Sequence, residues 1–211
     1  VEMWFQFCLI WSICASVDED GRKKMDNYIR EMEGTFPNKD SIYEYSVDVK
    51  AKTWMHWEER IKDGWKYNPN TPFFKLIVPT VDTIRYQFLC MALITVMNPV
   101  LIVGSVGTGK TSVLESTLSK FDPVEYSLLT VNMSAQTTSN QVQNIIESRV
   151  EKRTKGVYVP IGGKKLITFM DDLNMPAKDQ FGSQPPLELL KLWVDYGFWF
   201  DRERQVIKYI K

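Results

Sequence analysis

The 211-residue sequence has little histidine, little cysteine and no excess of either charge. His56 is the single histidine, and lysine plus arginine equal aspartate plus glutamate at 26 each. A neutral chain has no overall field to attract nucleic acid or anionic lipid, so we expect no nucleic-acid partner. The three cysteines are odd in number and lack metal-ligand spacing, which favours buried, reduced thiols and no disulfide. The lone His56 favours a surface or packing role over catalysis.

Long hydrophobic runs are also missing. The apolar opening, residues 3–15, is too short to span a bilayer, contains Gln6 and follows Glu2 instead of a basic stretch. It predicts neither a signal peptide nor an anchor, and we expect no membrane partner. The helical pattern already begins at Val1, which suggests a segment cut from a longer protein.

The first third of the chain predicts two helices and an irregular segment. Residues 3–16 have the composition of a buried helix, and residues 17–34 predict a second, more polar one. Its apolar stripe comprises Met25, Tyr28, Ile29 and Met32. Four prolines then break residues 35–79 into short pieces, including an alternating run at 41–47. An aromatic cluster here favours core or interface packing over stacking on a nucleobase; it comprises Trp54, Trp57, Trp65 and Tyr67.

From residue 80 onward, helical segments alternate with short apolar runs. Helices are predicted at 80–97, with Thr80 as its cap, at 112–121, at about 137–155, where Gly156 follows, and at 185–196, where Gly197 follows. Strands are predicted at 99–103, 126–131 and 166–170. This βαβα order predicts an α/β fold, a parallel sheet flanked by helices. Gly162 and Gly163 predict a hairpin within 157–166, and a second hairpin is predicted within 198–210. Lys152, Arg153 and Lys155 are assigned to a solvated helix end, and Cys90 to the core.

The strongest motif is GSVGTGKT, which fits GxxxxGK[ST] between a predicted strand and a predicted helix. In such a loop, glycines let backbone N–H groups converge on phosphates at the positive end of a helix. Lys110 would reach the β and γ phosphates, and Thr111 would ligate magnesium. The motif predicts a site for ATP or ADP with Mg²⁺, whose phosphate-binding residues are Gly104, Ser105, Val106, Gly107, Thr108, Gly109, Lys110 and Thr111.

A second motif is the buried run 166–170 followed by Asp171 and Asp172. Ligands of open α/β folds bind at the carboxyl edge of the sheet, where these acids would lie. Asp171 would hold magnesium through water. Asp172 stands where many such ATPases have a glutamate that polarises the attacking water, and it is one methylene shorter.

Longer runs carry a resemblance that covers nearly the whole chain. The most specific is DDLNMPAK at 171–178, continued by QPPLELL at 184–190. Others are WSI at 11–13 with DEDGRKK at 18–24, VPTVDT at 78–83 and NMSAQTT at 132–138. By these residues the chain resembles the third AAA+ module of dynein heavy chains, the axonemal type in particular.

The resemblance implies a P-loop NTPase fold of the AAA+ type with β-hairpin insertions. Residues 1–34 would be the end of the preceding module's small subdomain, 35–71 a connector rich in aromatics and proline, and 72–211 the large-subdomain core, incomplete at its C-terminal end. It also implies that the chain passes the adenine at Pro79, Thr80 and Val81. The hairpins would be the insertions typical of dynein modules.

The resemblance further implies a regulatory ATP-binding module of a minus-end-directed microtubule motor in the ciliary or flagellar axoneme. Its partners would be neighbouring AAA+ modules of the same heavy chain and, through the full-length protein, microtubules and intermediate and light chains. Sensors, lid and arginine finger would follow Lys211, so this chain alone is not expected to be a complete ATPase. Two alternatives are a freestanding P-loop kinase or GTPase, although the N/T-K-x-D motif of GTPases does not occur, and a truncated, non-catalytic fragment.

Overall fold

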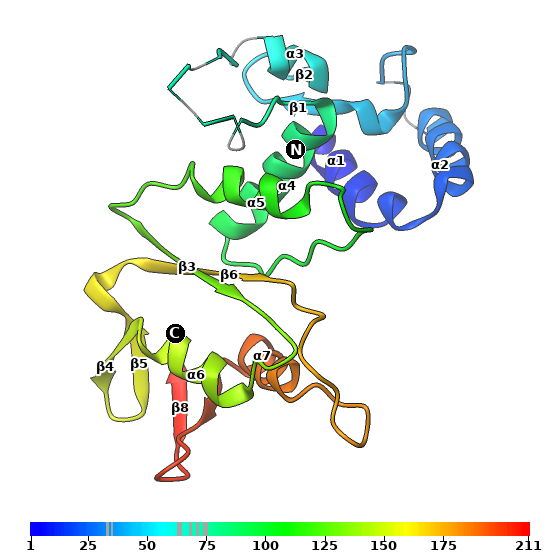
Figure 1. Ribbon diagram of the computed structural model, residues 1–211. Helices are drawn as coiled ribbons and strands as arrows, with labels where there is room; N and C mark the ends of the chain where they lie inside the picture. Colours follow the sequence, from blue (N-terminus) through cyan, green and yellow to red (C-terminus); the bar gives the residue numbers. More distant parts are fainter. Residues whose placement is uncertain (33, 35, 63–64, 68, 71, 74–75) are drawn as a thin grey trace. The chain divides into compact units, whose positions relative to one another are not determined.

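The computed structural model describes residues 1–211 except 33, 35, 63–64, 68, 71 and 74–75. The chain forms two compact units, Val1–Phe88 and Leu89–Lys211 (Figure 1). Across the described residues, no helix is both long enough and apolar enough to cross a membrane.

The first unit is built on two helices, as predicted. They are α1 (Glu2–Ser12), followed by a single 3-10 turn at Cys14–Ser16, and α2 (Glu19–Met32). In α2, Ile29 is buried whereas Tyr28 and Met32 are exposed, so only part of the predicted stripe packs. The main cluster of buried residues in this unit comprises Ile10, Cys14, Ile29, Phe36, Ile42 and Tyr43.

A small hairpin and its aromatic residues complete the first unit. After a 3-10 turn at Ile42–Glu44, β1 (Tyr45–Asp48) pairs antiparallel with β2 (Thr53–His56), and α3 (Trp57–Lys62) follows. The indole of Trp57 is fully buried and donates to the Tyr43 carbonyl at 3.2 Å. Trp54 stacks on Phe36 at 4.1 Å between ring centroids, which confirms packing for these two tryptophans. Trp65 and Tyr67 are exposed, contrary to the core alternative.

His56 and the cysteines mostly match their predicted roles. The imidazole of His56 packs edge-on against the Tyr45 ring at 5.4 Å, a packing role. All three cysteines are free; Cys14 and Cys90 are buried, whereas Cys8 is exposed, so the prediction of burial was wrong for Cys8.

A helix crosses the boundary between the units. In α4 (Val81–Thr95), the Thr83 N–H donates to Thr80 Oγ1 at 3.2 Å, and the Thr80 N–H donates to Thr83 Oγ1 at 2.8 Å. These reciprocal bonds satisfy a donor at the helix start and confirm Thr80 as the predicted cap.

The centre of the second unit is a parallel strand pair. β3 (Tyr126–Asn132) and β6 (Lys165–Asp171) pair over seven positions, from Tyr126 opposite Lys165 to Asn132 opposite Asp171. Because side chains alternate along a strand, the pair presents an apolar row to each face. One row, with Ile167 and Phe169, packs on α5 (Lys110–Leu118) and the end of α4.

The opposite row packs on two other helices. Leu129, Val131 and Met170 contact residues of α6 (Ser139–Glu147) and α7 (Pro185–Tyr196). Figure 1 shows α5 on one side of the strand pair and α6 and α7 on the other. Helices on both faces of a parallel sheet confirm the predicted α/β class.

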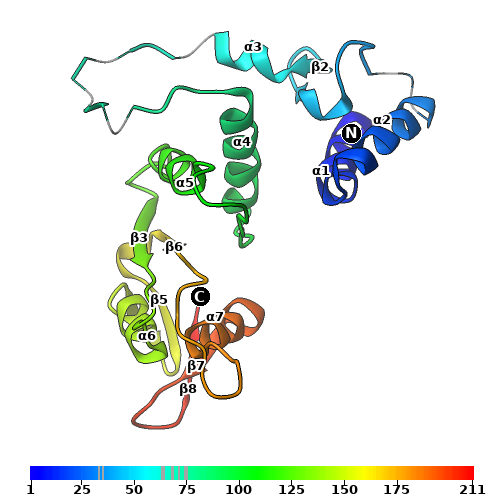
Figure 2. The same ribbon diagram turned by 45° about the vertical axis from the view of Figure 1, so that its right-hand side comes forward.

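A second sheet lies beside α6 and α7 (Figure 2). Its strands are β4 (Val150–Thr154), β5 (Val157–Pro160), β7 (Phe198–Phe200) and β8 (Ile207–Ile210), in the order β4-β5-β8-β7. Strands β5 and β8 are parallel, and the other pairs are antiparallel. The hairpin predicted within 198–210 is confirmed, as is the predicted helix 185–196, whose cap Gly197 has φ +71°.

Three predictions of local structure were wrong. Residues 99–103 form no strand, because no described segment pairs with them, and Leu101 and Val103 are exposed. The helix predicted to reach 155 ends at Glu147; Lys152, Arg153 and Lys155 belong instead to β4 and the turn after it. The hairpin predicted within 157–166 is displaced: the observed hairpin joins β4 to β5, and its tight turn is at Gly156, with φ +74°. Gly162 and Gly163 lie instead in a 3-10 turn (Ile161–Gly163) that leads from β5 to β6.

Candidate functional site

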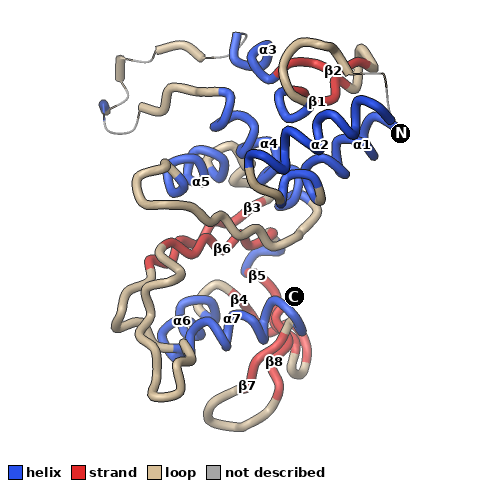
Figure 3. Tube along the Cα trace, turned by 90° about the vertical axis from the view of Figure 1, so that its right-hand side faces the viewer, coloured by secondary structure: helices blue, strands red, loops and turns tan. Residues whose placement is uncertain are grey.

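The glycine-rich loop leads directly into α5. Residues 99–109 lie outside any helix or strand, and the helix begins at Lys110 (Figure 3). Gly107 and Gly109 have φ values of +81° and +79°, a left-handed conformation that glycine adopts without steric cost. The first helical bond runs from the Val113 N–H to the Gly109 carbonyl at 3.0 Å. The N–H groups before it have no partner within the helix, which is the arrangement that favours a phosphate.

Side chains of the loop hold its curvature. The Lys110 ammonium donates to the carbonyls of Gly104 at 3.0 Å and Ser105 at 2.7 Å. Thr108 Oγ1 also donates to the Ser105 carbonyl at 2.9 Å. The lysine therefore lies over the loop, with its charge among the residues predicted to surround the phosphates.

The two predicted magnesium ligands are in contact. Thr111 Oγ1, in the first turn of α5, donates to Asp171 Oδ1, at the end of β6, at 3.1 Å. The residues are sixty positions apart in sequence, and the fold brings them together. A hydroxyl and a carboxylate are the hard oxygen donors that Mg²⁺ prefers, and Mg²⁺ sites with nucleotides use one or two such groups plus phosphate oxygens. The residues present fit the ion.

Asp172 lies beside this pair in an unusual backbone conformation. Its φ is +53°, its side chain is exposed, and its N–H donates to Asp171 Oδ1 at 3.0 Å. Its carbonyl accepts from the Met175 N–H at 2.9 Å. Asp172 is thus next to the predicted metal ligand, while its role towards water stays a prediction. Pro79, Thr80 and Val81 belong to the first unit, and their contact with adenine also stays a prediction.

Sequence reasoning missed the residues that support this edge of the sheet. Asn132 ends β3 directly opposite Asp171, and the Gln184 side-chain amide donates to the carbonyls of Asn174 at 3.1 Å and Pro176 at 2.6 Å. These bonds hold the segment after Asp172 against the start of α7. Asn132 follows the predicted strand 126–131 and Gln184 begins the run QPPLELL, but neither pattern indicated this supporting role.

A different part of the unit carries a partly buried polar group of side chains, here called the Glu147 cluster, comprising Glu147, Trp199, Asp201 and Lys208. Glu147 accepts from the Trp199 indole N–H at 2.9 Å and from Lys208 at 3.0 Å, and Lys208 also pairs with Asp201 at 2.9 Å. The cluster ties the β7–β8 hairpin to the end of α6. Trp199 is fully buried beneath it.

Hydrogen bonds set the ionisation of the cluster. Burial raises the pKa of Glu147, but bonds from Gln143, Lys208 and Trp199 outweigh it and hold the pKa below its ordinary value. The Arg204 backbone N–H, the Lys208 ammonium and the Glu203 backbone N–H lower the pKa of Asp201 to about 2. Burial lowers the pKa of Lys208, yet its bonds to Asp201 and Glu147 prevail and raise it.

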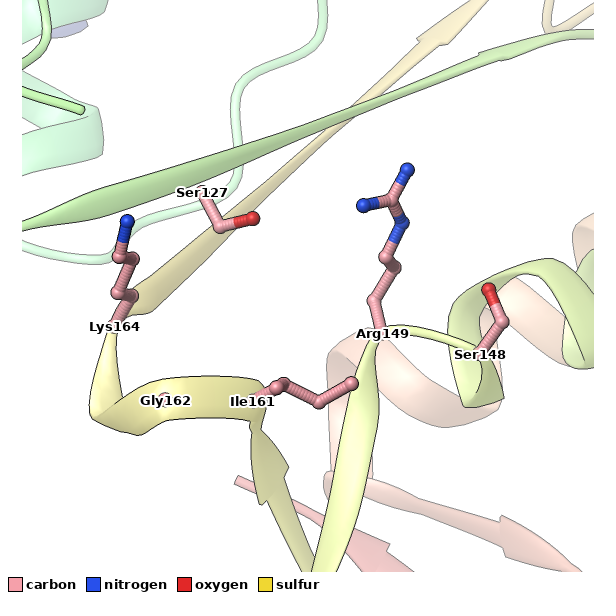
Figure 4. Close-up of a pocket in the computed structure, with 6 residues that line it drawn as sticks. All are labelled: Ser127, Ser148, Arg149, Ile161, Gly162 and Lys164. Carbon is pink, nitrogen blue, oxygen red and sulfur yellow. The ribbon is translucent and has the colours of Figure 1, made fainter. Parts of the chain in front are cut away.

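A pocket of about 530 Å³ opens elsewhere in the second unit (Figure 4). Its lining includes Ser127 of β3, Arg149 before β4 and Lys164 before β6, and both basic side chains point towards β3. Lys164 donates to the Pro123 carbonyl at 2.7 Å. None of the predicted phosphate-binding residues lines this pocket, so it is separate from the glycine-rich loop.

A glycine loop before a helix, together with an acidic strand end that meets the first helical hydroxyl, defines the class of P-loop nucleotide-binding proteins. Within that class, residues 65–211 match the model of the P-loop containing dynein motor region, and residues 1–59 match the dynein heavy chain AAA lid domain. The chain therefore belongs to the dynein motor region family.

Individual relatives agree with this family. The chain is 66% identical to Dynein axonemal heavy chain 2 of Mus musculus, 64% to that of Homo sapiens, and 53% to the Dynein-1-beta heavy chain, flagellar inner arm I1 complex, of Chlamydomonas reinhardtii. Each match covers 100% of this chain and 5% of the relative. The chain thus spans about a twentieth of the length of these heavy chains.

Proposed function

We propose that this chain is a regulatory nucleotide-binding module of an axonemal dynein heavy chain, which binds ATP or ADP with Mg²⁺ at residues 104–111. The contact between Thr111 Oγ1 and Asp171 Oδ1 at 3.1 Å carries the proposal, because it joins the two motifs at the point where the ion would bridge to phosphate. Lys110, Thr111 and Asp171 would hold the β and γ phosphates and the ion. Pro79, Thr80 and Val81 would contact the adenine.

The finer assignment is the third AAA+ module of the motor ring. The runs DDLNMPAK and NMSAQTT support it. Residues 1–34 would belong to the preceding module, 35–71 to a connector and 72–211 to the core; the lid-domain match at 1–59 includes the first of these segments and extends into the second. In this role the module passes its nucleotide state to neighbouring modules of a minus-end-directed microtubule motor. Microtubules and intermediate and light chains are partners of that full-length protein, in the axoneme of the cilium or flagellum.

Nucleotide titration tests the binding site. We expect the chain to bind a fluorescent ATP analogue in the presence of Mg²⁺, and Lys110→Ala to weaken this binding by roughly tenfold or more, because a charge-assisted contact to phosphate is lost. Lys152→Ala is the matched control, since it removes an exposed lysine from β4. Equal affinities of wild type and Lys110→Ala would refute the site.

A second arm of this experiment tests the regulatory role. In dyneins, by the resemblance, the first AAA+ module drives stepping. In the full heavy chain, Lys110→Ala is therefore expected to lower microtubule-stimulated ATP turnover without abolishing it, because the first module would still hydrolyse. Unchanged turnover would argue against regulation by this module, and complete loss would indicate that this module is itself the main motor site.

A further inference from the structure

Asp172 is the one residue of the candidate site other than glycine with a positive φ, at +53°. The remaining left-handed positions in the site are Gly107 and Gly109. Side chains with a Cβ meet a steric penalty in this conformation, and aspartate and asparagine tolerate it better than other residues because their short polar groups bond locally. The backbone at residue 172 therefore favours aspartate, asparagine or glycine.

The left-handed turn at Asp172 orients the Asp171 carboxylate. It turns the chain directly after β6, so that the Asp172 N–H returns to Asp171 Oδ1 at 3.0 Å. The same oxygen accepts from Thr111 Oγ1 at 3.1 Å, and the Met175 N–H closes the turn on the Asp172 carbonyl at 2.9 Å. Two of these three bonds use the backbone of Asp172, and none uses its carboxylate.

We infer that Asp172 is a positioning residue: its left-handed backbone, more than its carboxylate, fixes Asp171 for the magnesium ion. This inference rests on the proposed nucleotide-binding function. It gives a physical reason for an aspartate at a position where many ATPases have glutamate, because the longer side chain lacks the tolerance for this conformation. The residue type here follows from the turn that binding requires, whatever part the carboxylate plays towards water.

Two matched pairs of variants separate backbone from carboxylate. Asp172→Gly and Asp172→Ala both lack the carboxylate, but glycine tolerates a positive φ better than alanine does. Wild type and Asp172→Glu both carry a carboxylate, but aspartate tolerates a positive φ better than glutamate does. We expect Asp172→Gly to bind Mg²⁺–ATP more tightly than Asp172→Ala, and wild type more tightly than Asp172→Glu, each by roughly fivefold to thirtyfold, the equilibrium equivalent of the left-handed penalty. Affinity is measured with the fluorescent analogue in Mg²⁺ and again in EDTA.

The dependence on Mg²⁺ distinguishes positioning from a general loss of structure. Both differences should shrink in EDTA, since the Asp171 carboxylate then has no ion to hold. They should also disappear in the Asp171→Asn background, as the interaction term of a double-mutant cycle. Differences of equal size in EDTA, or in Asp171→Asn, would overturn the inference in favour of a purely structural turn.

Two other outcomes also decide the matter. Asp172→Gly and Asp172→Ala could bind Mg²⁺–ATP equally weakly while Asp172→Glu binds it as tightly as wild type. In that case the carboxylate matters for binding and the backbone conformation does not, which overturns the inference. If wild type shows no Lys110-dependent binding, the proposed function fails instead. The left-handed turn can then still be tested by urea unfolding, in which Asp172→Gly should have a higher free energy of unfolding than Asp172→Ala. The reverse order would refute the left-handed turn itself.

Discussion

The candidate nucleotide site and the Glu147 cluster, both in the second unit, are built in opposite ways. The glycine loop of the site is exposed, and the site is largely made by backbone: two left-handed glycines, a left-handed aspartate and the first turn of α5. The cluster is made by partly buried side chains over a fully buried tryptophan, with one ion pair joining α6 to the β7–β8 hairpin and a second within that hairpin. The comparison indicates that nucleotide binding and folding stability depend on different residues. Substitutions in the site should therefore change nucleotide affinity with little change in the free energy of unfolding, and substitutions in the cluster should do the reverse.

The largest effect is expected at Trp199, whose loss tests the stability side of the comparison. Trp199→Ala would leave a cavity in the main core and remove a bond to Glu147, and we expect a loss of about 3–5 kcal/mol in unfolding free energy. Urea unfolding followed by circular dichroism measures it. Phe200→Ala, on the exposed face of the same strand, is the control; an equal loss there would show that β7 does not anchor through its inner face.

A smaller effect is expected when Glu147, one of the two acidic members of the cluster, is removed. Glu147→Ala would leave the Trp199 indole N–H without its acceptor and Lys208 with only Asp201, costing about 1–3 kcal/mol. Glu151→Ala removes an exposed carboxylate from the neighbouring strand and should cost less than about 0.5 kcal/mol. If the two variants unfold at the same urea concentration, the cluster is not a source of stability.

The smallest effect is expected from pH, and its sign follows from the shifted pKa values. Glu147 and Asp201 have lowered pKa values in the folded state, so the stability they add is present above their ordinary values of 4.5 and 3.8. It is lost as pH falls, towards about 2 for Asp201. Lys208 has a raised pKa, so its contribution is present below 10.5 and is lost as pH rises through the folded value.

Thermal unfolding across this range measures the pH effect. The melting temperature should form a plateau from about pH 5 to about pH 10 and fall on either side. In Glu147→Ala the acid limb should become less steep. An acid limb that is identical in wild type and variant would mean that other carboxylates control the decline.

The sequence predicted those parts of the fold that depend on neighbouring residues. Gly197 ends α7 because its left-handed cap is a local requirement, and the run 166–170 lies in β6 because it is apolar except for Thr168. The glycines of the loop were likewise identifiable from spacing alone. Of the candidate site, the Thr111–Asp171 pair followed from two motifs with known roles, and the structure brings these residues together.

The rest depends on pairing between distant residues. Val150–Thr154 continues the helical pattern of α6 in sequence, and only its pairing with β5 makes it a strand. The run 99–103 has the composition of a strand and lacks a described partner. The bond between Glu147 and Lys208 joins residues 61 positions apart. No local pattern encodes these contacts.

The parallel register of β3 and β6 has a mechanical consequence. A pull along the strands, applied at opposite ends of the pair, would load the bonds of all seven registered positions together, so they would have to break together. The antiparallel β4–β5 hairpin, with a register shift between Lys152 and Thr154, would instead open one bond at a time from its free end. If the module transmits force between its neighbours, the strand pair that ends at Asp171 is the stiff element, and the hairpin is the compliant one.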